Sequence, residues 1–328
     1  MMQAMVIDRC GGADELHLAD IERPVAGRGQ VVIEVAYAGV NPADWKAREG
    51  WLAGYFDYRF PFVVGFDAAG IVAETGPGVE GVRIGDRVVT SSNQGLGERG
   101  TYAQLVRSDV DRVALLPAHV SLARAACLPT AAITAWEALF DVGQLKPGHK
   151  VLIHGGAGGT GSFAICLAAA HGASIAATCG PDNLEYLQRL SVKCPINYRT
   201  ADVASAVAAF APDGLDLIID TVGQGTLPRG VEWVRRGGTV ASIATLIAGE
   251  PQIDPASAAA RGVQLVPTMA NFERQGRQLR ALVERLATGQ FDAIALQTVP
   301  FAQAGAAHRA VQAGHVRGKI VLTVNSTI

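Results

Sequence analysis

The apolar positions in the first third of the chain occur in short runs. Three of these runs are "QVVIEVAYAGV" (30–40), "AAGIVAETG" (68–76) and "DRVVTSS" (86–92), and glycine and proline separate them. Short runs rich in β-branched residues between turn residues are typical of strands. The first third is therefore expected to be β-rich.

The pattern changes at Ser121. The segment "SLARAACLPTAAITAWEALFDVG" predicts a helix that begins at Ser121 and ends at Gly143. Continuous apolar strands then alternate with helices, which is typical of a parallel sheet covered on both faces. We expect strands at 151–155, 174–179, 215–220, 238–244 and 263–266, and helices at about 160–171, 182–191, 202–210, 226–236 and 275–288.

A length of 328 residues exceeds one ordinary core and favours two domains. The C-terminal segment "FDAIALQTVPFAQAGAAHRAVQAGHVRGKIVLTV" predicts a strand, a helix and a strand that rejoin the N-terminal domain. We therefore expect a discontinuous domain of residues 1–122 and 267–328, and a nucleotide-binding domain of residues 123–266.

Composition excludes several function classes. The formal net charge is −2 and no run of Lys and Arg occurs, which argues against a nucleic-acid partner or a membrane surface. The start "MMQAMVIDRC" has no export signal, so a cytoplasmic location is expected. The longest apolar run, 162–179, is broken by His171 and Gly172 and predicts a buried helix and strand. Five cysteines without C-x-x-C spacing indicate reduced thiols.

The segment "VLIHGGAGGTGS" contains the most informative motif. Gly156, Gly158 and Gly161 fit G-x-G-x-x-G between a predicted strand and a predicted helix, which is the context of a dinucleotide-binding turn. The first glycine would permit the sharp turn, the second would admit the pyrophosphate, and the third would allow close contact between helix and strand. The motif predicts a nicotinamide dinucleotide cofactor.

The next strand ends in Thr178, Cys179 and Gly180, where an NAD-binding protein would place a ribose-binding acid. Asp182 and Glu185 come only later, on the following helix. The neutral strand end favours NADP(H) over NAD(H).

The chain resembles the zinc-independent quinone oxidoreductases of the medium-chain dehydrogenase/reductase superfamily. The resemblance covers nearly the whole chain and includes "AGVNPADW", "FPFVVGFDAAGIVAETGPGV", "IGDRVV", "AACLPTAAITAWEAL", "INYR", "DLIIDTVG", "RRGGTVASIA" and "RGKIVL". It implies an α/β fold with a Rossmann doubly wound parallel sheet and a β-rich, partly barrel-like (GroES-like) catalytic domain. It also implies a homodimer formed through edge strands of the Rossmann sheets.

The resemblance further implies that the site holds no zinc. Asn41, Phe66 and Thr130 stand where the zinc alcohol dehydrogenases have their catalytic ligands. Phe supplies no donor, and Asn and Thr are poor zinc ligands. The segment 90–105 contains no cysteine, so the structural zinc lobe is missing as well.

Several cofactor contacts follow from the same resemblance. Asn41 would place its amide beside the nicotinamide and the substrate carbonyl, and Tyr198 would contact the 2′-phosphate of NADP. Asn183 stands where a lysine is common. The full predicted set is Asn41, Thr134, Gly156, Gly158, Gly159, Thr160, Gly161, Thr178, Asn183, Tyr198, Val222, Ala244 and Arg317. A solvated pair of Arg317 and Lys319 is the alternative for the tail.

The predicted reaction is hydride transfer from NADPH to a small-molecule quinone, enone or enal, in which conjugation spreads the charge that develops. Asn41, Tyr55 and Tyr58 are the catalytic candidates, and Trp45 is a further substrate contact. For the aromatic residues, a hydrophobic wall between strands is the alternative. Asp67 is assigned no catalytic role.

The histidines are expected to be structural. His154 is expected in the core or a loop, and His308 and His315 have no third metal ligand beside them.

Two other functions stay open: an NADP-binding module with little turnover, and an alcohol dehydrogenase-like enzyme acting on another carbonyl. A short-chain dehydrogenase is excluded because no tyrosine has a lysine four residues later.

Overall fold

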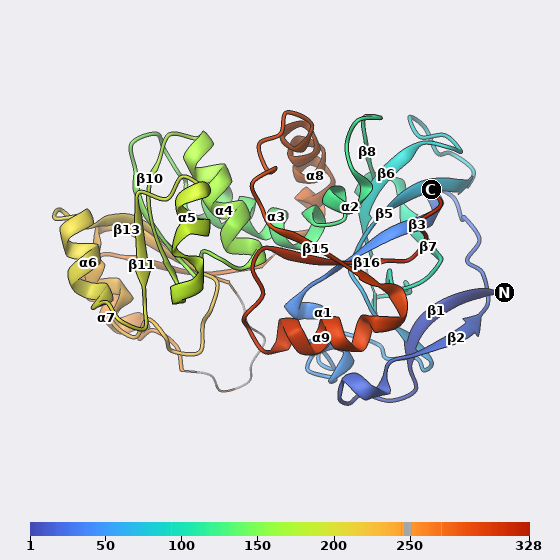
Figure 1. The fold of residues 1–328 in the computed structure, drawn as a ribbon, viewed down its shortest axis with the longest axis horizontal. Helices are drawn as coiled ribbons and strands as arrows, with labels where there is room; N and C mark the ends of the chain where they lie inside the picture. Colours follow the sequence, from blue (N-terminus) through green and yellow to red (C-terminus); the bar gives the residue numbers. More distant parts are fainter. Residues whose placement is uncertain (93, 244, 246–248, 250, 270) are drawn as a thin grey trace. The chain divides into compact units, whose positions relative to one another are not determined.

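The computed structural model describes the whole chain except residues 93, 244, 246–248, 250 and 270 and the side chain of residue 272. The chain forms two compact units (Figure 1). Unit 1 comprises Met1–Ile133 and Phe272–Ile328, and unit 2 comprises Thr134–Asn271. The domain limits expected from the sequence, 122/123 and 266/267, stay a prediction. No helix among the described residues has the length and apolar character needed to span a bilayer.

Unit 2 contains a six-stranded sheet of order β11-β10-β9-β12-β13-β14, and all its neighbouring strands are parallel. This is the 3-2-1-4-5-6 order of a Rossmann sheet. The strands are β9 (Lys150–His154), β10 (Ser174–Cys179), β11 (Cys194–Asn197), β12 (Leu215–Asp220), β13 (Val234–Ile243) and β14 (Gln264–Thr268).

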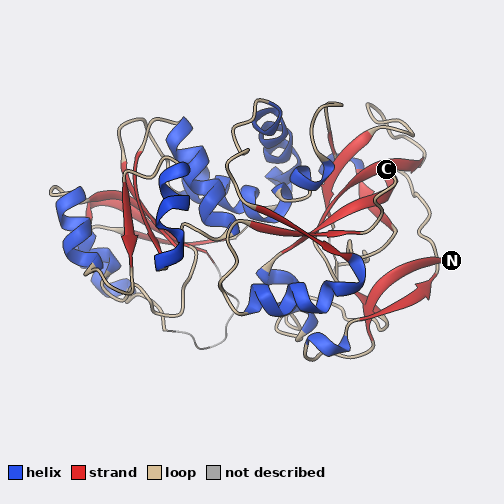
Figure 2. Ribbon diagram, viewed as in Figure 1, coloured by secondary structure: helices blue, strands red, loops and turns tan. Residues whose placement is uncertain are grey.

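Helices cover both faces of this sheet (Figure 2). Two helices lie on one face, α4 (Gly159–Ala170) and α5 (Leu184–Arg189), and two on the other, α6 (Val203–Phe210) and α7 (Pro255–Arg261) (Figure 1). Burial on both faces explains the apolar run at 151–153 in β9 and the apolar run at 217–219 in β12. Short 3₁₀ turns occur at Pro181–Asn183 and Gly230–Trp233.

The helix predicted at 226–236 is wrong. The segment forms a short 3₁₀ turn and then enters β13 at Val234. Leu227, Val231 and Val234 have helical spacing, and all three are buried in the core on the α6 side of the sheet. The observed turn and strand bury these three side chains without a helix. Val234 already belongs to the sheet, where it pairs with Leu215 of β12.

Unit 1 is built on a seven-stranded sheet of order β15-β16-β3-β5-β6-β8, with β7 also paired to β3. Its strands are β3 (Gln30–Val40), β5 (Asp67–Thr75), β6 (Arg87–Ser91), β7 (Leu105–Asp109), β8 (Ala114–Leu115), β15 (Leu296–Pro300) and β16 (Lys319–Thr323). A smaller sheet contains β1 (Met2–Ile7), β2 (His17–Ile21) and β4 (Phe62–Val63).

The tail of the chain lies inside the larger sheet. β16 pairs antiparallel with β3, so that Ile320 lies opposite Val40. The helices of the tail are α8 (Phe272–Ala287) and α9 (Ala304–Gln312), and α9 packs beside α1 (Pro42–Arg48) (Figure 1). Residues from both ends of the chain therefore build one core.

The segment that begins at Ser121 is helical, as predicted. Ser121 caps α2 (Leu122–Ala125) by accepting a hydrogen bond from the backbone N–H of Arg124. The helical segment continues through α3 (Leu128–Trp136) and a π-helical turn (Glu137–Val142) that ends at Gly143. The remaining 3₁₀ turns are Ala13–Glu15, Val110–Arg112 and Phe301–Gln303.

Candidate active site

The glycine turn of unit 2 joins the carboxyl end of β9 to α4. Gly155, rather than Gly156, has the positive φ of 78° that the reversal requires. A Cβ at Gly156 would lie 2.8 Å from the Cβ of Ala177, so this glycine is needed for packing. A Cβ at Gly161 would collide with the carbonyl oxygen of Gly155, as expected for close helix–strand contact.

Gly158 differs from the other glycines of the turn. A Cβ there would meet only the Gly155 carbonyl oxygen, at 3.6 Å, and its φ of −75° suits any residue. The space beside Gly158 is therefore open. Gly159 and Thr160 begin α4, and the first N–H groups of a helix have no acceptor within it. Backbone donors and open space together form a cradle for an anionic group.

Thr178 supports this turn from within the protein. Its side chain is buried, and its hydroxyl accepts from the N–H of Gly155 at 3.0 Å and shares a 2.7 Å hydrogen bond with His154. His154 also bonds to Thr226. Burial lowers the pKa of His154, so the ring stays neutral as a link between two hydroxyls. The expected core role of His154 agrees with this placement.

The surface at the end of β10 carries an aromatic residue and a cation. The Tyr198 hydroxyl lies 3.9 Å from where a Cβ of Gly180 would stand, and its ring is exposed. The Arg199 guanidinium lies 6.0 Å from the Tyr198 ring centroid. Sequence reasoning did not identify Arg199. Asn183 ends the short turn after β10.

Val222 follows β12, and its backbone N–H donates to the Asp220 carboxylate at 3.0 Å. Thr134 is buried on α3, and Arg317 is exposed just before β16. Ala244 lies outside the described residues.

A second group of polar residues lies in unit 1, which we name the polar cluster: Asn41, Asp44, Asp67, Thr130 and Lys319. Asn41 follows β3 and is extended because Pro42 comes next. Its Nδ2 donates to Asp67 at 2.9 Å, and its Oδ1 accepts from the Lys319 ammonium at 2.5 Å. Asp67 also accepts from the hydroxyl of Thr130 at 2.5 Å and from its N–H at 3.0 Å.

Asp44 connects the polar cluster to a buried chain of hydrogen bonds. It accepts from the N–H of Asn41 at 2.6 Å, from the N–H of Phe66 at 3.2 Å and from the Tyr102 hydroxyl at 3.3 Å. The Tyr102 oxygen lies 3.1 Å from His308 Nε2, and Arg48 lies 3.2 Å from His308 Nδ1.

The chemistry of this chain fixes its direction. Arg48 can only donate, so His308 Nδ1 accepts and His308 Nε2 carries the proton. The hydroxyl proton of Tyr102 then points to Asp44. His308 was assigned no role from the sequence, yet it is fully buried, whereas His315 is exposed.

Burial controls the protonation of these groups. Burial and the neighbouring Asp67 raise the pKa of Asp44 to about 8, against the effect of the Asn41 N–H. Burial also raises the pKa of Asp67, while the Lys319 ammonium opposes that change. Burial and the Arg48 charge lower the pKa of His308 to about 3, which keeps its ring neutral.

The two tyrosine candidates do not join the polar cluster. The Tyr58 hydroxyl donates to the Ala47 carbonyl at 2.6 Å, and its ring packs against Phe56 and Phe62. Burial raises the pKa of Tyr58, which disfavours ionisation. Tyr55 is 65% exposed. These contacts match the aromatic wall that was the alternative for Tyr58.

Among the described residues of unit 1, the buried polar groups without a hydrogen-bond partner include the indole N–H of Trp45 and the amide of Gln94. Trp45 was a sequence candidate, whereas Gln94 carried no signal that would have singled it out. Within the described ranges, no three His, Cys, Asp or Glu side chains are grouped closely enough to hold a metal ion.

Sequence reasoning missed most of the polar cluster. Lys319 was weighed as a solvated residue, but it is 3% exposed, so that alternative is wrong. Asp67 received no role, although it holds both Asn41 and Thr130. Only Asp44 left a local signal, because an acid three residues after Asn41 completes a capping box. Lys319 is 278 residues from Asn41 in the sequence.

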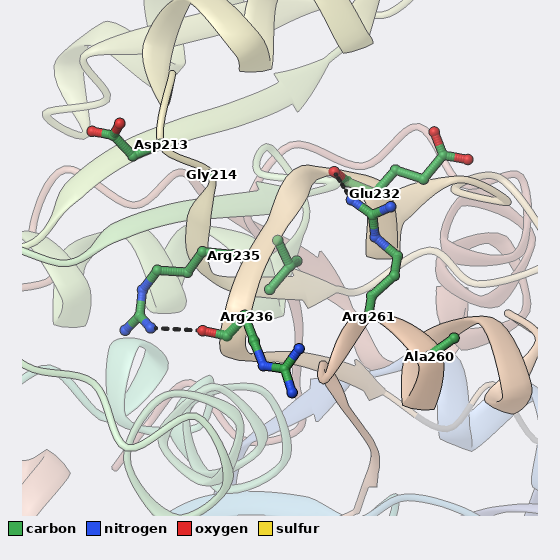
Figure 3. A pocket seen from close by; sticks show the side chains of 8 residues that line it. Asp213, Gly214, Glu232, Arg235, Arg236, Ala260 and Arg261 are labelled. Carbon is green, nitrogen blue, oxygen red and sulfur yellow. Dashed lines mark hydrogen bonds between the residues drawn. The ribbon is translucent and has the colours of Figure 1, made fainter.

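A surface pocket of about 540 Å³ lies elsewhere on unit 2 (Figure 3). Its lining includes Gly214, just before β12, and Val234, where β13 begins. Arg235 and Arg261, also in the lining, donate to backbone carbonyl oxygens (Figure 3). The pocket is at the amino ends of the strands, whereas nucleotides bind at the carboxyl ends of such sheets. It is therefore distinct from the glycine turn.

Two family models match the chain. "Alcohol dehydrogenase GroES-like domain" matches residues 27–118, and "Zinc-binding dehydrogenase" matches residues 190–322.

Individual proteins are similar too. The solved quinone oxidoreductase from Coxiella burnetii is 30% identical, with 99% of each chain covered and a TM-score of 0.85. The 2-methylene-furan-3-one reductase of Solanum lycopersicum is 35% identical over 246 residues, or 73% of this chain. The synaptic vesicle membrane protein VAT-1 homolog of Rattus norvegicus is 31% identical over 255 residues, or 76% of this chain. The match spans 61% of the length of each of these last two relatives.

Three observations indicate the same family. Unit 2 has the strand order of a Rossmann sheet, and both ends of the chain build the mixed sheet of unit 1. The likeness to a solved quinone oxidoreductase extends from end to end. The chain belongs to the quinone oxidoreductases of the medium-chain dehydrogenase/reductase superfamily.

Proposed function

We propose that this protein is an NADPH-dependent oxidoreductase that transfers hydride to a quinone or an α,β-unsaturated carbonyl compound without a metal ion. Family membership supports oxidoreductase chemistry with a nicotinamide cofactor. The observation that carries the narrower proposal is the makeup of the polar cluster, where a lysine ammonium is bonded to the Asn41 amide.

The polar cluster does not fit the zinc ion that the description of one matched family implies. Asn41 and Thr130 are already hydrogen-bonded to charged side chains, and Phe66 has no donor atom. A catalytic zinc needs three N, S or carboxylate ligands and an open position. The ammonium of Lys319 would also repel a divalent cation at Asn41. This donor set supports a metal-independent reaction.

The glycine turn fits a dinucleotide. The open side of Gly158 and the N–H groups of Gly159 and Thr160 would hold the pyrophosphate. When bound, the reduced nicotinamide supplies the hydride. Thr134, Val222 and Arg317 remain part of the proposal as further cofactor contacts that the family resemblance implies.

The residues around the carboxyl end of β10 favour NADP(H) over NAD(H). No acid lies at Thr178, Cys179 or Gly180, and the Tyr198 hydroxyl is close to Gly180. Arg199 provides a cation beside Tyr198, whereas Asn183 stands where the family often has a lysine. A cation and a hydroxyl suit the 2′-phosphate of NADP.

A conjugated acceptor suits a site without a metal. Hydride transfer to a quinone or enone spreads the negative charge over several atoms, so hydrogen bonds are sufficient to stabilise it. One well-placed donor contributes about 2.7–4 kcal/mol to such stabilisation. Asn41 Nδ2 has a second hydrogen besides the one donated to Asp67. The name of the tomato relative, 2-methylene-furan-3-one reductase, supports a conjugated carbonyl as the acceptor.

The test is steady-state oxidation of NADPH and NADH with 1,4-benzoquinone, 9,10-phenanthrenequinone and a 2-alkenal. We expect turnover with at least one acceptor, a higher kcat/KM with NADPH than with NADH, and unchanged rates after treatment with EDTA. Cofactor binding without turnover would favour a binding module. Activity that is lost with chelator and restored by zinc would contradict the metal-free reaction.

The proposal includes a homodimer through edge strands of the Rossmann sheet, of which β14 is one. Light scattering measures this, and a monomer at working concentration would contradict it.

A further inference from the structure

Lys319 is a buried lysine with an unusual set of partners. It is 3% exposed, and its ammonium donates to the Val40 carbonyl at 3.0 Å and to Asn41 Oδ1 at 2.5 Å. Removing a charged ammonium from water is costly unless it is compensated. A neutral apolar side chain would fill the start of β16 at a lower desolvation cost. The buried charge of Lys319 therefore indicates a functional role.

The compensating charge is Asp67, and Asn41 lies between the two. Among the described residues, Lys319 and Asp67 form no direct ion pair, and each bonds to one end of the Asn41 amide. An ammonium only donates, whereas a carboxylate only accepts. The amide therefore has a single possible orientation, with Oδ1 toward Lys319 and Nδ2 toward Asp67.

This arrangement also polarises the amide. The negative end of its dipole faces the cation, and the positive end faces the anion. Hydrogen bonds in such a chain strengthen one another in a low-dielectric interior. The Lys319 ammonium at Oδ1 draws electron density from the amide nitrogen, so the second Nδ2 hydrogen of Asn41 is a stronger donor than it would be without that cation.

We propose that Lys319 is a positioning residue for the reaction: it fixes and polarises the Asn41 amide so that the remaining Nδ2 hydrogen binds the carbonyl oxygen of the acceptor. This inference rests on the proposed function. It assigns to a residue of the final strand a role in stabilising the negative charge that hydride transfer creates on the acceptor oxygen.

The kinetic test compares Lys319→Met with Lys319→Arg, and uses Lys193→Met as the control. Lys193 is exposed, and its ammonium donates to the hydroxyl of Ser174. We expect Lys319→Met to lower kcat about 10²-fold, with a smaller change in KM and an unchanged NADPH dissociation constant. Lys319→Arg should retain part of the rate, and Lys193→Met should match the wild type. An unchanged kcat in Lys319→Met would overturn the proposal.

A double-mutant cycle tests whether Lys319 acts through Asn41. In an Asn41→Ala background, Lys319→Met should lower kcat by less than about threefold, because the amide it positions is gone. Full additivity of the two losses would contradict the proposal.

A double variant that removes both buried charges is the control for a loss of activity caused by misfolding. Asp67→Asn with Lys319→Met removes both buried charges, so the double variant should recover thermal stability relative to either single variant. Its kcat should stay low, because the neutral pair no longer polarises Asn41. A double variant with wild-type kcat would overturn the proposal.

A measurement without turnover separates this proposal from the proposed function. With ¹⁵N-asparagine labelling, the Asn41 side-chain signals are assigned by their loss in Asn41→Asp. They should shift in Lys319→Met and stay in place in Lys193→Met. If the wild type reduces no acceptor but these signals shift, the proposed function fails and the contact stands. If the signals do not move, the positioning role fails even in an active enzyme.

Discussion

At the scale of single residues, several buried polar groups of unit 1 form one connected series of hydrogen bonds. Arg48, His308 and Tyr102 form a directed chain that ends on Asp44. Asp44 in turn holds the backbone of Asn41. A neutral histidine is essential to this chain, because a protonated ring could not accept from the arginine.

This requirement makes stability depend on pH. The pKa of His308 falls from 6.5 to about 3 on folding, so the unfolded chain takes up the proton first. The contribution of neutral His308 to the stability of the fold is therefore present above pH 6.5 and is lost as the pH falls toward 3. When the pH falls from 7.5 to 5, the free energy of unfolding should decrease by about 2 kcal/mol more in the wild type than in His308→Gln, measured by urea unfolding. His315→Gln, at an exposed site, should follow the wild type. Parallel curves for the wild type and His308→Gln would contradict a buried neutral ring.

The glycine turn gives a second prediction at this scale. Gly158→Val should weaken NADPH binding at least about tenfold, measured by calorimetry, because the side chain occupies the open space beside α4. The melting temperature without cofactor should change little, since no neighbour is displaced. Gly161→Val is the contrasting variant and should fail to fold, because its side chain meets the Gly155 carbonyl. Undiminished NADPH affinity in Gly158→Val would show that the pyrophosphate lies elsewhere.

At the scale of elements, β16 links the two ends of the chain. Its residues 319–322 are buried, and it pairs with β3 on one side and β15 on the other. Leu322 belongs to the core of unit 1 and is fully buried.

Leu322→Ala should therefore destabilise unit 1 by about 2–5 kcal/mol through lost burial and the cavity it leaves. Leu115→Ala is the matched control, because Leu115 is 48% exposed on β8 of the same sheet and its loss should cost under about 0.5 kcal/mol. Chemical denaturation followed by tryptophan fluorescence measures both. Equal effects of the two substitutions would contradict the place of β16 in the core.

At the scale of the whole molecule, the two units differ in how the chain builds them. Unit 2 is one continuous segment that holds the complete six-stranded sheet. Unit 1 needs both ends of the chain, because β15 and β16 complete the sheet that β3 begins.

A fragment of residues 128–271, which keeps α3 whole, should fold cooperatively and bind NADPH. Residues 1–133 alone should not fold, because β3 would lose β16 and the core would lose the tail. Circular dichroism with thermal unfolding and cofactor titration measures both. A stable fragment 1–133 would show that the tail is dispensable for unit 1.

The sequence by itself determined the order of elements and the place of the nucleotide turn. Apolar strands alternating with helices predicted the Rossmann sheet, because side chains buried on both faces leave a continuous apolar run. "GGAGGTG" predicted the turn, because the positive φ of Gly155 and the close backbone contact at Gly161 both require glycine. The prediction failed at 226–236, where helical spacing was satisfied by a turn and a strand, since burial depends on the neighbours and not on the period alone.

Only the tertiary structure decided the composition of the polar cluster. Lys319 and Asn41 meet because β16 pairs with β3, and no local pattern encodes a contact between residues 278 apart. The same holds for His308, which bonds to Tyr102 and Arg48 from a different helix. Buried charges need partners, and the partners of a buried charge are set by which strands and helices pack together, which the fold alone fixes.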